Sequence, residues 1–98
     1  MSEHDYLLGN KISRPLHDIL ADVCSRHRIS SADILSPRRF RNLVYARQEA
    51  WWLAYTQSEA SYPAIGKFFN RDHTTVMFGI RRHAERIGVD VPCVQRSH

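Results

Sequence analysis

The chain has 98 residues, of which 43% are hydrophobic and 24% charged, so it has room for one small globular domain with little stability to spare. Fourteen Lys and Arg residues outweigh ten Asp and Glu residues, for a net charge of +4, and arginine outnumbers lysine. Arginine suits contacts to phosphates and base edges. No segment approaches the roughly 18 consecutive apolar residues that a membrane-spanning helix needs, so we predict no membrane span.

The first 15 residues contain charges and no long apolar run, so we predict no signal peptide. The chain has two cysteines, Cys24 and Cys93, and the simplest interpretation is a reduced, cytoplasmic protein. Cys24 and His27 form only half of a metal-ligand pattern, and nothing downstream completes it. We therefore predict no metal site and no cofactor.

Residues 1–13 are mixed and polar, and we predict a flexible N-terminal arm there, followed by a folded domain over residues 14–88. The first helix is predicted from about Pro15 to Arg28, because proline suits a first turn and apolar residues recur at helical spacing. Those apolar residues are Leu16, Ile19, Leu20 and Val23.

A short helical turn is predicted within residues 29–35, capped by Ser30 or Ser31. It must stop near Ser36, since Pro37 disfavours helical geometry in the residue before it. A basic loop then carries three arginines within four residues, in the order Pro37-Arg38-Arg39-Phe40-Arg41. Taken alone, such a cluster would by default be a solvated surface.

The longest helix is predicted from about Arg41 to Gln57. Its mainly apolar seam alternates steps of three and four residues and consists of Leu43, Ala46, Ala50, Leu53 and Gln57. Trp51 and Trp52 are adjacent and cannot point in one direction on a helix. The favoured interpretation is that both serve the core, where indoles bury much area; an exposed one would instead offer a surface to a partner protein.

Residues 61–82 predict two helices joined by a tight polar turn. Ser61 is a good N-cap and Pro63 suits the first turn of the first helix. Asn70 can adopt the left-handed conformation that ends a helix, and Asp72 can cap the helix that follows.

The second of these helices has a polar first turn and an apolar face. The polar residues are His73, Thr74 and Thr75, and the apolar ones are Val76, Met77 and Ile80. This arrangement is typical of a helix-turn-helix, whose second helix presents its N-terminal side chains to base edges in the major groove. Gly88 is predicted to stop the helix, and residues 89–98 to form a C-terminal tail, so the chain as a whole is predicted to be all-α.

Four segments in one register carry a family signature. They are Arg71-Asp72-His73-Thr74-Thr75-Val76, Ala46-Arg47-Gln48 with Ala50 and Leu53, Tyr62-Pro63-Ala64-Ile65-Gly66 with Phe69, and Ala32-Asp33-Ile34-Leu35-Ser36. Together they resemble the C-terminal DNA-binding domain of the bacterial chromosomal replication initiator, DnaA, from about Leu16 to Ile87.

The resemblance implies a small, Trp-repressor-like helical bundle that binds double-stranded DNA at a nine-base, A·T-rich box resembling TTATCCACA. It also implies which residues read bases: Arg39 in the minor groove, and Asp72, His73, Thr74 and Thr75 in the major groove. From the resemblance and from their charge or polarity we further expect phosphate contacts from Arg38, Arg41, Arg47, Gln48, Tyr62, Pro63, Lys67, Arg71 and Arg81.

The chemistry of these side chains agrees with the implied roles. Aspartate can accept a hydrogen bond from a cytosine amino group, and threonine can hydrogen-bond or place its methyl group against a thymine methyl. Histidine can donate or accept at a purine edge, depending on its tautomer. Arginine suits a narrow, A·T-rich minor groove, where negative potential is concentrated.

The chain also departs from the family pattern. Many members carry two glycines where this chain has only Asn70, Phe40 replaces a small polar residue, and Tyr55 replaces a basic one. The sequence contains no phosphate-binding loop of the type G-x-x-x-x-G-K-[ST]. We therefore expect a DNA-binding module standing alone, bacterial or phage-encoded and associated with the nucleoid.

The first functional hypothesis is a sequence-specific DNA-binding protein that regulates transcription or modulates replication initiation by competing for initiator boxes. The alternative is an adaptor that uses Trp51, Trp52 or the tail to contact RNA polymerase or the initiator. We do not predict an enzyme, because no nucleophile–base pair, paired carboxylates or cofactor loop is visible.

Overall fold

The computed structural model describes residues 13–92, and within them it contains five α-helices and no strand. The helices are α2 (Leu16–His27), α3 (Ser31–Leu35), α4 (Arg41–Gln57), α5 (Tyr62–Phe69) and α6 (His73–Ile87). The all-α prediction is confirmed. Residues 1–12 of the predicted arm and residues 93–98 of the predicted tail, including Cys93, lie outside the described part.

The helix ends follow local chemistry. Ser30 accepts a hydrogen bond from the Asp33 amide at 3.0 Å, and Ser61 accepts one from the Ala64 amide at 3.3 Å. The short α3 ends at Leu35, as the proline two residues later requires. Asn70 ends α5 in the left-handed conformation, with φ 58°.

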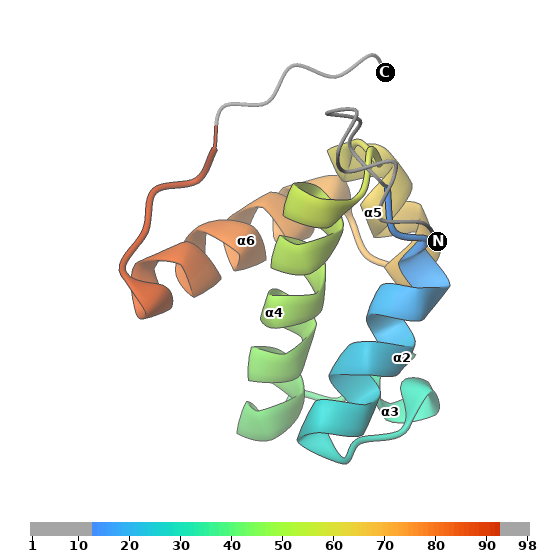
Figure 1. The fold of residues 1–98 in the computed structure, drawn as a ribbon. Coiled ribbons are helices and arrows are strands. Elements are labelled where there is room, and N and C mark those ends of the chain that lie inside the picture. Colours follow the sequence, from blue (N-terminus) through green and yellow to red (C-terminus); the bar gives the residue numbers. More distant parts are fainter. Residues whose placement is uncertain (1–12, 93–98) are drawn as a thin grey trace.

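Helix α4 is the central element (Figure 1), with α2 packed along one side of it and α6 along another. The core lies where these helices and α5 meet. Its members include Ile19 and Val23 from α2, Ala46, Ala50 and Ala54 from α4, Ile65 and Phe69 from α5, and Val76 and Ile80 from α6. The small alanines of α4 let the neighbouring helices approach closely, so α6 takes its position from the α4 surface.

A glycine makes the contact between α4 and α6 close. A Cβ atom added at Gly79 would lie 2.4 Å from Cε3 of the Trp51 ring, well inside van der Waals contact. The Trp51 residue is 4% exposed and packs edge-on against Phe69, with ring centroids 6.4 Å apart. The indole is therefore largely enclosed by the core, and α6 sits directly on it.

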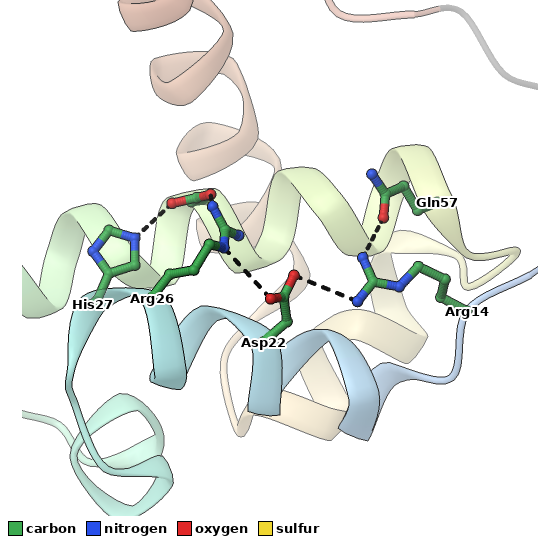
Figure 2. A network of polar contacts seen from close by, with 6 residues as sticks. Arg14, Asp22, Arg26, His27 and Gln57 are labelled. Carbon is green, nitrogen blue, oxygen red and sulfur yellow. Dashed lines mark hydrogen bonds and ion pairs between the residues drawn. The ribbon is translucent and has the colours of Figure 1, made fainter.

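A polar network joins α2 to α4 along their exposed side (Figure 2). Glu49 of α4 accepts from Arg26 and contacts His27 Nε2 at 2.6 Å, both on α2. Burial raises the pKa of Glu49, but the hydrogen bonds and positive charge of His27 and Arg26 outweigh it and hold that pKa below its usual value. At the other end, Arg14 donates to Gln57 at 2.5 Å and contacts Asp22 at 3.5 Å.

The described part of the tail packs against the bundle. The Tyr55 hydroxyl donates to the Pro92 carbonyl at 3.0 Å, and Val91 packs against the core. Tyr55 is buried and stacks on Tyr62 with ring centroids 4.9 Å apart. The departure from a basic residue at position 55 thus serves packing. None of the helices in residues 13–92 has the length and apolarity to cross a membrane.

The Gly79→Ala variant should lose stability although alanine favours helices by up to about 1 kcal/mol over glycine. Overpacking against the buried Trp51 ring typically costs about 1–3 kcal/mol, which outweighs that gain. Urea unfolding measures the difference. Arg81→Ala, at an exposed position of the same helix, is the matched control and should stay within about 0.5 kcal/mol of the wild type. A Gly79→Ala domain more stable than the wild type would contradict the close packing.

His83 is half-buried, with its ring 5.8 Å from that of Trp52. Burial lowers the pKa of His83. The positive charge of Arg86 lowers this pKa further, while the negative charge of Glu49 partly offsets both effects. Because the pKa of His83 in the folded state lies below its value of 6.5 in the unfolded state, the stability contributed by the neutral imidazole is fully present above pH 6.5. This contribution is lost as the pH falls from there through the folded-state pKa. The urea concentration at the unfolding midpoint should therefore decrease as the pH is lowered from 7.5 to 5.5. The decrease should be smaller in His83→Gln. An equal fall in both proteins would rule out this role for His83.

Candidate nucleic-acid interface

The turn between α5 and α6 is three residues long, Asn70-Arg71-Asp72. The Arg71 amide donates to the Gly66 carbonyl at 2.7 Å, which closes the turn on α5. A Cβ atom at Gly66 would lie 2.5 Å from the Arg71 carbonyl oxygen, so only glycine permits this approach. Asn70, with φ 58°, makes the turn without the two glycines common in the family.

Asp72 caps α6 by accepting a hydrogen bond from the Thr74 amide at 2.9 Å. Hydrogen bonds from the Thr74 backbone and side chain lower the pKa of Asp72, so the carboxylate stays ionised as an acceptor. The four side chains at this tip point to solvent: Asp72, His73, Thr74 and Thr75 are all exposed. The first turn of α6 therefore presents donors and acceptors outward.

The basic loop lies on the same side of the molecule as this tip. A groove of about 710 Å³ runs between them, lined by Pro37 and Arg39 from the loop and by Thr75 and Phe78 from α6. Arg39 is exposed, and Gln48 of α4 also lines the groove. One face thus carries both the polar helix tip and the arginine loop.

Two arginines hold the start of this loop through one carbonyl group. Arg47 of α4 donates to the Ser36 carbonyl at 2.7 Å, and Arg71 of the turn donates to the same oxygen. Arg47 also donates to the carbonyls of Ile34, at 2.7 Å, and Asp33, at 3.0 Å. The helix-turn-helix and the basic loop are therefore tied together at Ser36.

Arg47, which was expected at a phosphate, is directed into the domain in this structure. The residue is only 4% exposed, and its guanidinium donors point inward to backbone carbonyls. Burial lowers the pKa of Arg47, and the positive charges of Arg71 and Arg39 lower it further. Arg47 acts in this structure as an internal anchor of the loop. Arg71 is half-buried and makes the same kind of contact, also donating to the Phe69 and Asn70 carbonyls.

The other residues expected at phosphates lie at or near the surface. The exposed ones are Arg38, Arg41, Pro63, Lys67 and Arg81, and the half-buried ones are Gln48 and Tyr62. The Gln48 carbonyl oxygen accepts from Arg86 at 2.6 Å, which fixes the orientation of its amide in the groove. The Arg86 guanidinium in turn lies 4.1 Å from the centre of the Tyr45 ring.

Sequence reasoning missed Phe78, which is 58% exposed in the middle of the outward face of α6. Its spacing of four residues from Thr74 and three from Thr75 places all three side chains on one helical face, and that spacing could have found it. The adaptor hypothesis relied on an exposed tryptophan or on the C-terminal tail. Trp51 is instead buried, and Trp52 is half-buried beside His83.

A three-residue turn, a capped helix with a polar exposed tip and a basic loop beside it define a helix-turn-helix protein of the nucleic-acid-binding class. A family profile described as the helix-turn-helix of the bacterial dnaA protein matches residues 16–82. The chain belongs to this family of DNA-binding helix-turn-helix domains.

Relatives with curated descriptions are chromosomal replication initiator proteins DnaA. The chain is 42% identical over 77 residues to that of Bradyrhizobium sp. (strain ORS 278), covering 78% of this chain and 16% of the relative. It is 37% identical over 81 residues to that of Brucella abortus biovar 1 (strain 9-941), covering 82% and 16%. With the protein of Ruegeria sp. (strain TM1040) identity is 35% over 100 residues, covering 95% and 21%. The chain thus spans about a sixth to a fifth of the length of these relatives, and no solved structure matches it.

Replacing Arg47 by methionine should destabilise the domain, because the Ile34 carbonyl loses its charged donor, whereas the Ser36 carbonyl keeps Arg71 and the Asp33 carbonyl keeps Ser36. Each buried group left without its partner typically costs about 1–3 kcal/mol. Thermal unfolding measures the loss, and Arg38→Met in the exposed part of the loop is the control that should leave the melting temperature unchanged. An Arg47→Met domain as stable as the control would show that the anchor contributes nothing.

Proposed function

We propose that this domain binds a DnaA-box-like, A·T-rich nine-base site in double-stranded DNA and reads its sequence. The observation that carries the proposal is that the α6 tip and Arg39 both line one groove on the protein surface. The tip residues, Asp72 to Thr75, would enter the major groove, and Arg39 the neighbouring minor groove. Two simultaneous contacts to adjacent grooves fix the register on the duplex.

The exposed basic residues support phosphate contacts around these two points. Arg38 and Arg41 lie on either side of Arg39 in the sequence of the loop, and Lys67 and Arg81 lie on α5 and α6. Such contacts orient the domain and supply salt-dependent affinity, but carry no sequence information. We assign base discrimination to the tip and the loop arginine, and general affinity to this outer set.

A domain with this site would occupy the boxes that replication initiators recognise. The relatives carry the name chromosomal replication initiator protein, and their matching segments resemble this one in sequence. We propose that the protein regulates transcription or modulates replication initiation in bacterial cells by competing for such boxes. A footprinting competition between this domain and a purified initiator on one box tests that step.

Binding to a box-containing duplex should exceed binding to a scrambled duplex of equal composition, and it should weaken steeply with salt. Contacts to roughly four to six phosphates give a log–log slope of about −4 to −5. Thr74→Ala and His73→Ala should each lose about 1–3 kcal/mol on the box and little on the scrambled duplex, because they remove base contacts. Fluorescence anisotropy titrations across a salt series measure both the log–log slope and the loss of binding free energy in each variant.

Two controls separate base reading from general affinity. Arg41→Ala should weaken binding to both duplexes alike, because a phosphate contact is blind to sequence. Ser25→Ala, exposed on α2, should change neither. Equal affinity of the wild type for box and scrambled duplexes would refute sequence-specific binding.

A further inference from the structure

Phe78 is a large apolar side chain left bare on a polar helix face. The residue is 58% exposed, whereas the opposite face of α6 buries Val76, Ile80 and Ala84 in the core. Its flanking residues on the exposed face are Thr74 and Arg82, each four positions away. More than half of the Phe78 surface is therefore left outside the packing of the bundle, and its place beside the groove makes that surface available to a partner.

The ring of Phe78 lies at the wall of the groove between α6 and the basic loop, together with Thr75 and Arg39. Arg82 places its guanidinium carbon 5.9 Å from the ring centroid, at the outer limit of a cation–π contact. Besides apolar residues such as Leu35 and Trp51, the lining of this groove includes Arg39, Arg47 and Arg71 and, among the described residues, no Asp or Glu. This charge favours a polyanionic partner over an apolar protein surface.

A duplex offers one prominent apolar group in its major groove, the 5-methyl group of thymine. Thr75 and Phe78 are three residues apart, so their Cβ atoms lie roughly 5–6 Å apart on one helix face. Phe78 stands one turn behind the tip and has the longer side chain, which compensates for its greater distance from the end of the helix. A phenyl ring in this place can contact a methyl group beside the base pairs that the tip approaches.

We infer that Phe78 is a specificity-determining residue that contacts the 5-methyl group of one thymine in the bound site. This inference rests on the proposed function, because it places α6 in the major groove. It adds a requirement for thymine, in preference to any base without that methyl group, at one position, separate from any thymine contact that Thr74 or Thr75 makes. Arg82, whose guanidinium carbon lies 5.9 Å from the ring centroid, would add positive charge next to the DNA.

Single replacements of thymine by deoxyuridine, scanned along both strands of the box, test this directly, because each removes one methyl group and leaves the base pairing intact. For the wild type, one replacement should weaken binding about three- to fivefold, the effect of losing one buried methyl group. In Phe78→Ala the same replacement should have no effect, since its partner is already gone. Anisotropy titrations of each protein on each duplex supply the double-mutant cycle.

Phe40→Ala is the matched control, because Phe40 is equally bare at 62% exposed but lies in the basic loop. It should keep the wild-type response to deoxyuridine at the position that Phe78 contacts. Circular dichroism should show unchanged melting for both variants, since neither ring is buried.

The two levels of the proposal fail in different ways. If the wild type prefers the box, but its deoxyuridine profile is the same as that of Phe78→Ala, the methyl contact is wrong and the proposed function stands. If the wild type shows no preference for the box over the scrambled duplex, the proposed function is wrong and the methyl contact falls with it.

Discussion

The carbonyl oxygen of Ser36 is the point on which the interface depends. Arg47 reaches it from the central helix α4 and Arg71 from the turn that precedes α6. Hydrogen bonds from ionised donors are stronger than neutral ones, so these two fix where the basic loop begins relative to the helix tip. A loop ordered in the free domain loses less conformational entropy on binding than one that must order on its target.

The same anchor concentrates positive charge. Burial lowers the pKa of Arg71, and the positive charge of Arg39 lowers it further. The positive charges of Arg71 and Arg39 likewise lower the pKa of Arg47. Mutual repulsion among these three guanidinium groups is unfavourable in the free domain. A phosphate backbone placed against the groove would relieve it. The charge arrangement that is costly within the domain therefore favours an anionic partner at the groove.

Close helix packing decides the direction in which α6 points. Gly79 lets the helix rest on the Trp51 ring, and Gly66 lets α5 rest on the turn before α6. Trp51 is itself held by Phe69, so the position of the helix tip is transmitted from the core and not set by the surface residues. Interiors packed at this density deform little, which keeps the tip and the loop at a constant separation.

The sequence by itself determined the helices, because their signals are local: the apolar spacing of α4, the prolines, and Ser61, Asn70 and Asp72 at the ends of α5 and α6. It also picked out the Asp72–Thr75 tip through the family motif. Only the tertiary structure decided the part played by Arg47, since charge suggests surface and nothing local reveals three carbonyls converging on one guanidinium. The same holds for His83, because how far a residue at the edge of a helix face is buried depends on the neighbours that pack against it.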